Sequence, residues 1–213
     1  MKKPVKWMMG IAMAAVVAFS PACRAFGEEA PGGRKPLVVY FSRVGTSKSF
    51  QGVDAVSSAS LPKGNTIVIA NMVHDIVGGD MFQVVTVDPY PASYDATTDQ
   101  ALREQNANAR PRLSTHVPNI KDYDTIYLGY PDWWGTLPMP IFTFLEEYDF
   151  SGKTIIPFCT HEGSGLGRSE RDIAKLCPKA KILKGFAVRG SSVDRARGEV
   201  GDWLASLGQA AKR

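Results

Sequence analysis

Apolar and polar positions alternate along the chain in blocks that predict strands separated by helices. Five short segments are rich in apolar and β-branched residues, as strands of a buried sheet are: 37–41, 81–87, 125–130, 154–159 and 182–188. Segment 81–87 alternates between apolar and polar residues, which favours a place nearer the sheet edge. Pro157, in the fourth segment, cannot donate a hydrogen bond to a neighbouring strand.

The segments between these strands carry apolar residues three and four positions apart, the spacing of one helix face. Helices are predicted over 66–77, 138–148, 167–176 and 194–207, and a more polar helix over 95–108. Strands that alternate with helices favour a parallel sheet with right-handed crossovers. The sequence therefore predicts an α/β fold, a doubly wound five-stranded parallel sheet with helices on both faces. Ligands of such folds bind beyond the carboxyl ends of the strands.

Residues 1–27 have the pattern of a secretory leader. A basic stretch precedes an apolar run over 7–19, which is too short to span a bilayer comfortably. Cleavage is expected after Ala25 or Gly27. A lipoprotein signal that ends at Cys23 is the first alternative, and an uncleaved membrane anchor is the second, less favoured because the apolar run is short. We therefore expect an exported protein, either periplasmic or anchored to a membrane through a lipid on Cys23.

The rest of the chain has the size of one domain. A flexible linker rich in proline, glycine and charge is predicted over 28–36, and the domain over 37–210. The whole chain has 25 basic and 21 acidic residues. Four basic residues lie in the leader, namely Lys2, Lys3, Lys6 and Arg24, so 21 residues of each sign remain. No basic surface for nucleic acid is expected.

The loop after the first predicted strand is short and rich in hydroxyl groups. Ser42 ends the strand and Thr46 follows, but 48–63 interrupts the loop before a helix opens at Gly64, Asn65 and Thr66. The N–H groups at a helix start can hold a phosphate. The sequence therefore predicts a split phosphate site, and an ordinary capped loop is the alternative.

The loop after the third predicted strand carries two adjacent tryptophans, Trp133 and Trp134. Pro131 and Pro138 stiffen it, so it can present a flat apolar face to a planar ring. We expect one of the two tryptophans to pack against a neighbouring helix and the loop to form one wall of a ring pocket.

The loop after the fourth predicted strand is rich in glycine, which lets the backbone approach a ligand closely. It runs from Thr160 through His161, Gly163 and Gly165 to Gly167. Its spacing excludes a nucleophile elbow, a dinucleotide fingerprint and a zinc-protease helix. His161 is either a residue near the ring or a solvated loop histidine.

Cys159 and Cys177 are not expected to form a disulfide, although export would permit one. Cys159 ends the fourth strand, and Cys177 follows the helix 167–176. Ten helical residues rise about 15 Å, whereas bonded cysteines need Cα atoms within roughly 7 Å.

At these three loops the chain resembles the flavodoxin-like family, especially its exported bacterial branch. The most specific stretches are Tyr-Pro-Asp-Trp-Trp-Gly at 130–135 and Phe-Cys-Thr-His-Glu-Gly-Ser-Gly-Leu-Gly at 158–167. Weaker matches include 39–43, 63–66, 109–111 and 144–154. The resemblance implies the strand order 2-1-3-4-5, a non-covalent flavin mononucleotide (FMN) and redox work with an unidentified partner.

The resemblance also assigns roles to residues. Ser42, Asn65 and Thr66 would hold the phosphate, with Arg43 and Thr46 as further cofactor-binding candidates. The ring would be flanked on one side by Pro131, Asp132, Trp133, Trp134 and Gly135. Its other side would face Thr160, His161, Gly163 and Gly165. No side chain is expected to act as a catalytic acid, base or nucleophile, and no metal site is expected.

The chain departs from the family pattern in two ways. Residues 48–63 interrupt the phosphate loop, and the third loop lacks the aromatic residue that flavodoxins often stack on the outer face of the ring. We expect either a one-electron carrier or an FMN-dependent oxidoreductase of the quinone or NAD(P)H type, although no nicotinamide site is readable. The alternative is a cofactor-free binding module that keeps the fold.

Overall fold

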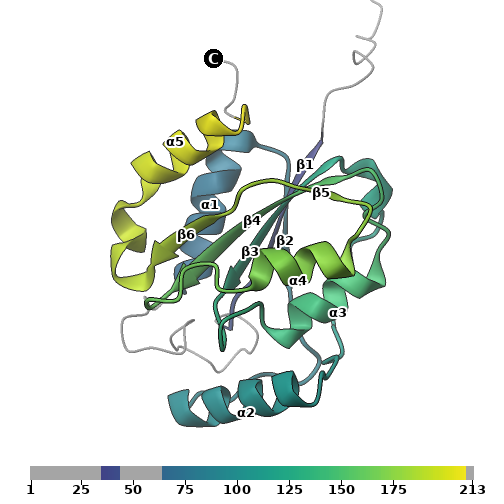
Figure 1. Cartoon of the computed structure of the whole chain (residues 1–213), viewed down its shortest axis with the longest axis vertical. Coiled ribbons are helices and arrows are strands. Elements are labelled where there is room, and N and C mark those ends of the chain that lie inside the picture. The colour runs from purple at the N-terminus through teal and green to yellow at the C-terminus, as the bar shows by residue number, and fades with distance from the viewer. Residues whose placement is uncertain (1–34, 44–63, 210–213) are drawn as a thin grey trace, which may run out of the picture. The chain divides into compact units, whose positions relative to one another are not determined.

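The computed structural model describes residues 35–43 and 64–209 of the chain. The strands are β1 (Pro36–Phe41), β2 (Asp80–Val84), β3 (Thr125–Pro131), β4 (Thr154–His161), β5 (Lys181–Ile182) and β6 (Phe186–Arg189). The α-helices are α1 (Asn65–Val77), α2 (Tyr94–Asn106), α3 (Met139–Glu147), α4 (Ser169–Leu176) and α5 (Arg197–Ser206), and η1 (Ile120–Asp122) and η2 (Gly190–Arg195) are 3₁₀ helices (Figure 1). The five α-helices of the described residues begin and end within three residues of the predicted bounds, whereas η1 was not predicted.

The strands form one parallel sheet in the order β2-β1-β3-β4-β5, and β6 also pairs with β4. This confirms the predicted order and fold class. β1 and β3, in the middle, are almost wholly buried, which explains why their sequences are continuously apolar. β1 begins at Pro36, so the last residue of the predicted linker belongs to the sheet.

The prediction of one continuous strand over 182–188 is wrong, because residues 183–185 separate β5 from β6. Ile155 of β4 accepts a hydrogen bond from Leu183 N at 3.0 Å, so the backbone of Ile155 faces this edge. Pro157 lies two residues on and faces the same edge, where it has no N–H to donate. Pairing resumes one residue later, where Phe158 meets Phe186. Pro157 therefore breaks the neighbouring strand and leaves its own intact.

The second strand is shorter than the predicted 81–87, and ends at Val84. Residues 85–87 continue along an antiparallel partner instead. Ser114 N donates to Val85 O at 2.8 Å, and Val87 N donates to Arg112 O at 2.9 Å. The segment that connects α2 to β3 therefore covers part of this edge of the sheet.

Two apolar cores flank the sheet. Ile69 and Val73 of α1, with Val200 and Leu204 of α5, belong to the core on one face. Ile141 and Phe144 of α3, with Ile173 of α4, belong to the core on the other (Figure 1). The layers therefore agree with the prediction of helices on both faces.

Helix α2 lies apart from these layers, beyond the sheet in Figure 1. Its buried residues are Thr97 and Ala101. Polar contacts tie it to the carboxyl ends of β1 and β3. Trp134 Nε1 donates to Thr98 O at 3.1 Å, and Arg43 Nη1 donates to Thr97 Oγ1 at 2.9 Å. The polar helix predicted over 95–108 thus lies over the edge where ligands bind in this fold class.

Cys159 and Cys177 are both free and buried, which confirms the prediction that they are not bridged. None of the described helices is long and apolar enough to cross a membrane. Residues 35–43 and 64–209 contain no group of three or more His, Cys, Asp or Glu placed to hold a metal ion. The predicted leader, its alternative lipid site at Cys23, and Thr46 lie outside the described residues.

Candidate cofactor site

The predicted phosphate residues meet at the carboxyl edge of the sheet. Ser42, Asn65 and Thr66 are fully buried. Thr66 Oγ1 lies 2.9 Å from Thr160 Oγ1, so the start of α1 meets the end of β4. Gly64 precedes α1 at φ 83°, a conformation suited to glycine, and gives no side-chain cap to the helix.

The side chain of Arg43 extends toward the start of α2, which the sequence did not indicate. Its side chain is buried, and Nη1 donates to Pro91 O at 2.8 Å and to Ala92 O at 3.2 Å. These bonds, with the one to Thr97, join the end of β1 to the start of α2. Arg43 therefore positions the segment between β2 and α2, whatever further part it plays in binding a cofactor.

The loop after β3 is built around Asp132. Its Oδ1 accepts a hydrogen bond from Gly135 N at 2.9 Å, and its own N–H donates to Thr160 O at 2.8 Å. The chain between them turns through left-handed conformations, with φ 57° at Trp134 and φ 78° at Gly135. A tryptophan at positive φ is strained, and such strain is concentrated at functional sites.

The two tryptophans have different environments. Trp133 is only 3% exposed and makes edge-to-face contacts with Phe41 and Tyr90, with ring centroids 5.5 and 5.0 Å apart. Trp134 is 46% exposed. One tryptophan is buried, but these ring contacts of Trp133 are with β1 and with the segment that precedes α2, where packing against a helix was expected. Trp134 is left as the exposed aromatic face of the loop.

A cavity of about 190 Å³ lies beside this loop. It is lined by Asp132, Trp133, Trp134, Tyr94 and Thr98. Tyr94, at the start of α2, is 47% exposed, and sequence reasoning missed it. The only local signal was an aromatic residue at the start of a polar helix. Tyr94 brings to the cavity an aromatic side chain from outside the three loops.

Two polar atoms of this loop are buried without a hydrogen bond of normal geometry among the described residues. One is the donor Trp133 Nε1, and the other is the acceptor Asp132 Oδ2. Buried polar atoms usually have partners, so unpartnered ones call for an explanation. A flavin ring has carbonyl acceptors and an imide N–H donor along one edge, so the polarity of the two atoms fits such a ligand.

Burial raises the pKa of Asp132, and four neighbours oppose that rise: the Gly135 N–H, the Ser164 hydroxyl, and the charges of His161 and Arg168. Desolvation therefore outweighs these favourable contacts. Asp132 is a carboxylate whose charge is poorly compensated in the described part of the chain.

His161 is held by its own loop. Gly163 N donates to His161 Nδ1 at 2.8 Å, so Nδ1 is unprotonated in this arrangement. Burial lowers the pKa of His161, and the nearby charges of Asp132 and Glu162 do not reverse this. At neutral pH the ring is therefore neutral, with its proton on Nε2.

The loops after β3 and β4 fit together at Gly167, which sequence reasoning did not single out. Arg168 N donates to Gly135 O at 2.9 Å. A Cβ atom on Gly167 would overlap this same carbonyl oxygen, and Gly167 has φ 52°. Gly163 and Gly165 also have positive φ, of 142° and 62°. The glycine-rich loop is therefore shaped to approach the tryptophan loop.

These features, a doubly wound parallel sheet with a cavity between the loop after β3 and α2, agree with the comparison to known families. A model of the flavodoxin family matches residues 53–207. The chain belongs to the flavodoxin family. No curated protein sequence matches it.

Solved structures support membership in this family. A candidate flavoprotein from Bacteroides uniformis is 30% identical, with 82% of this chain and 99% of that chain covered and a TM-score of 0.64. One from Bacteroides eggerthii is 27% identical, with 83% and 99% covered and a TM-score of 0.65. A Lactobacillus acidophilus flavoprotein in complex with FMN is 22% identical, with 76% and 98% covered and a TM-score of 0.57, and so shares the fold.

Proposed function

We propose that this flavodoxin-family protein binds FMN without a covalent bond and works in electron transfer or as a small flavin oxidoreductase. The observation that carries the proposal is Trp134. It is a large apolar side chain, nearly half exposed, held at positive φ beside a cavity at the carboxyl edge of the sheet. Its Nε1 is held by Thr98 O at 3.1 Å, and backbone strain of this kind is concentrated at ligand-binding sites, which supports a role of the exposed ring face in binding.

The ring would occupy the cavity between the tryptophan loop and α2. Trp134 and Tyr94 offer it aromatic faces. Trp133 Nε1 is a buried donor, and Asp132 Oδ2 a buried acceptor, without a hydrogen bond of normal geometry in the described part of the chain. The structure thus provides the apolar surface and the few polar groups that ligand pockets combine.

The phosphate would be held at the start of α1 by Ser42, Asn65 and Thr66. The helix dipole favours an anion there, and Gly64 leaves the helix without a side-chain cap. Arg43 brings a buried positive charge to the end of β1, next to Ser42 in the chain. Its links to Pro91 and Ala92 would also place Tyr94 against the ring.

Bound FMN would supply one- or two-electron redox chemistry, and the protein would set its electrostatics. Stacking by Trp134 would disfavour an electron-rich ring. The carboxylate of Asp132 opposes added negative charge nearby. Neutral His161 offers a donor at Nε2, and Gly163 and Gly165 let the backbone approach a ring edge.

A flavin titration tests the proposal. Addition of FMN to the full chain should perturb the visible flavin bands, and Trp134→Ala should weaken binding about ten-fold or more through loss of stacking. Trp134 is preferable to Trp133, because removal of the buried Trp133 would disturb the core. Val87→Ala, at another exposed apolar residue outside this cavity, is the matched control and should bind as the parent does.

Reductive titration of the complex separates the two kinds of redox work. Two resolved one-electron steps favour a carrier, and a single two-electron step favours a reductase. The second candidate function, a cofactor-free binding module, is favoured by the interruption of the phosphate loop by 48–63. An unperturbed flavin spectrum at saturating FMN would support that module and reject the flavoprotein.

We also propose that the protein works outside the cytoplasm. The basic start and the apolar run over 7–19 support this. Fractionation of cells with mass spectrometry of the mature N-terminus tests it. A start after residue 25 or 27 indicates a periplasmic protein, and a lipidated Cys23 indicates an anchored one. An intact Met1 in the cytoplasm would contradict export.

A further inference from the structure

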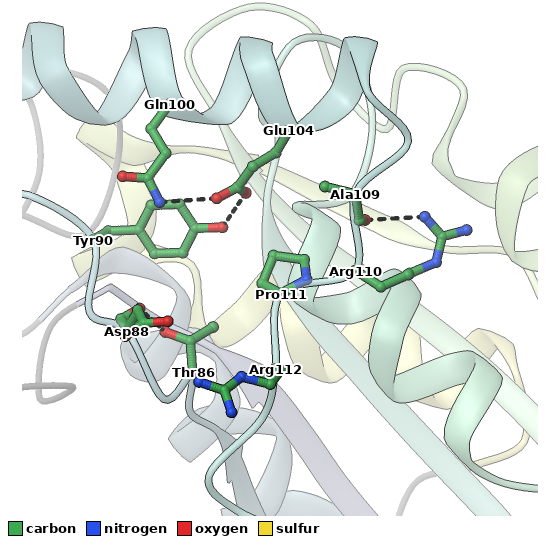
Figure 2. A pocket seen from close by; sticks show the side chains of 9 residues that line it. All are labelled: Thr86, Asp88, Tyr90, Gln100, Glu104, Ala109, Arg110, Pro111 and Arg112. Atoms are coloured by element: carbon green, nitrogen blue, oxygen red, sulfur yellow. Dashed lines mark hydrogen bonds between the residues drawn. The ribbon is translucent and has the colours of Figure 1, made fainter.

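A second cavity, of about 250 Å³, lies beneath α2, between that helix and the segments 86–90 and 109–112 (Figure 2). Tyr90 separates it from the candidate cofactor site, because the Tyr90 ring lines this cavity and also packs edge-to-face on Trp133. At roughly 30 Å³ for each water molecule, the cavity has room for about eight waters. It can therefore hold a small organic molecule separately from the cofactor.

The wall formed by α2 is rich in hydrogen-bond acceptors. Glu104 accepts from the Tyr90 hydroxyl through Oε2 and from Gln100 Nε2 through Oε1 at 2.8 Å (Figure 2). Burial and the Glu104 charge raise the pKa of Tyr90 well above its usual value, so the hydroxyl stays protonated and oriented to Glu104. Each carboxylate oxygen keeps another lone pair, and Gln100 Oε1 has no donor within the described ranges.

Arg112, below Tyr90 in Figure 2, supplies donors. Its guanidinium has no ion pair or hydrogen bond with any described residue. The neighbouring Arg110 differs, because its Nε and Nη2 both bind Glu146 at 2.6 Å and its Nη1 binds the carbonyls of Asn108 and Ala109. Arg112 is thus the basic residue of this cavity whose donors remain for a ligand.

The other residues that line the cavity further restrict the class of ligand that it could bind. The Tyr90 ring and Pro111 give the cavity an apolar surface. Asp88 adds a carboxylate that makes no hydrogen bond to the described part of the chain. A ligand that fits must donate hydrogen bonds on the α2 side, accept them at Arg112, and have a small apolar body.

We propose that this cavity binds a free amino acid with a short apolar side chain. Its carboxylate would pair with the Arg112 guanidinium, and its ammonium group would donate to Gln100 Oε1 and the Glu104 carboxylate. The apolar side chain would lie against Tyr90 and Pro111. Because α2 also carries Tyr94 and Thr98, the amino acid and the cofactor would share this helix as a wall.

Calorimetric titration of the full chain with L-valine, which has eight non-hydrogen atoms, tests the proposal. Two analogues of L-valine test whether both of its charged groups are recognised: 3-methylbutanoate lacks the ammonium group, and 2-methylpropylamine lacks the carboxylate. Each should bind at least about ten-fold more weakly than L-valine, because each leaves one charged wall unpaired. Equal binding of 3-methylbutanoate would reject the amino acid in favour of a simple anion site.

Arg112→Gln should weaken L-valine binding about three- to five-fold, since it removes a charge-assisted pair at an exposed guanidinium. Arg103→Gln changes an exposed arginine of α2 that does not line the cavity and should leave binding within about two-fold. Unfolding curves of both variants should match the parent, as neither guanidinium has a described partner. No L-valine binding to the parent, or equal binding by Arg112→Gln, would overturn the proposal.

Discussion

The carbonyl oxygen of Gly135 occupies the space that a Cβ atom on Gly167 would need. Arg168 N donates to the same oxygen at 2.9 Å, so the loops after β3 and β4 meet at this point. Backbone, which cannot move aside as a flexible side chain can, forms the contact. The relative position of the two loops therefore depends on the absence of a side chain at residue 167.

Gly167→Ala should destabilise the protein by about 2–3 kcal/mol, since it adds both a backbone overlap and a positive-φ penalty. Gly165→Ala is the matched control, because Gly165 also has positive φ, at 62°, but a Cβ there would meet nothing within 4 Å. It should lose only about 1 kcal/mol. Urea unfolding measures both free energies, and equal losses would show that the contact with Gly135 has no energetic weight.

Asp132 should make stability depend on pH in a direction opposite to that of a salt-bridged carboxylate. Its folded-state pKa is raised, chiefly by burial. The stabilisation this gives is complete below the unfolded pKa and is lost as pH rises through the folded pKa. At neutral pH the ionised group therefore destabilises the fold, and Asp132→Asn should become more stable relative to the parent as pH rises from about 3 to 7.

Two variants separate the charge of Asp132 from its hydrogen bond. Asparagine keeps an oxygen that can accept from Gly135 N, whereas Asp132→Ala removes it and should be about 1–2 kcal/mol less stable than Asp132→Asn at every pH. Thermal unfolding across the pH range gives both curves. If the difference in stability between Asp132→Asn and the parent did not change with pH, the raised pKa of Asp132 would be contradicted.

The arrangement of the sheet could be predicted because its signals are local. Continuous apolar runs such as 125–130 reflect burial on both faces, and alternation with helical spacing indicates parallel order. Pro157 indicated that β4 would lose a hydrogen bond to one of its two neighbouring strands, but the sequence did not indicate which neighbour. The answer depends on which neighbour the backbone of Pro157 faces. It faces the edge shared with β5 and β6, and the break lies between those two strands.

The candidate residues that could be predicted lie in the loops that directly follow the predicted strands or open the helix after them. The tryptophan pair and the glycine-rich loop are contiguous motifs and were found. Tyr94 was missed because α2 reaches the site through non-local bonds, from Arg43 to Thr97 and from Trp134 to Thr98. Gly167 was missed because it is needed for a close contact with the carbonyl oxygen of Gly135, which belongs to another loop.

Cys159 and Cys177 should react slowly with thiol reagents in the folded protein. Both are buried, and burial raises the pKa of Cys159 well above its usual value and that of Cys177 to about 11. The thiolate is the reactive form, so little of it is present at pH 8. Iodoacetamide labelling followed by peptide mass spectrometry should find both cysteines modified in denaturant and nearly unmodified without it. Rapid native labelling of either one would show that its surroundings open readily.

Glu162 should weaken FMN binding relative to riboflavin, if the phosphate binds at the start of α1. Its Oε1 and the Asn65 Nδ2 both occupy space that a Cβ on Gly190 would need, so the carboxylate lies close to a proposed phosphate residue. Arg189 Nη2 bonds to the Glu162 backbone carbonyl at 3.3 Å, which leaves the carboxylate charge without an ion pair among residues 35–43 and 64–209.

Glu162→Gln should therefore strengthen FMN binding by about two- to five-fold, the size of a partly screened surface interaction. Riboflavin, which has no phosphate, should bind both proteins equally. The gain should shrink as salt rises from about 0.01 to 1 M, since screening acts on the same repulsion. Glu199→Gln, at an exposed carboxylate of α5, should change neither affinity. Fluorescence titrations with the two flavins measure these affinities, and an equal change for FMN and riboflavin would place Glu162 near the ring or ribityl chain instead of the phosphate.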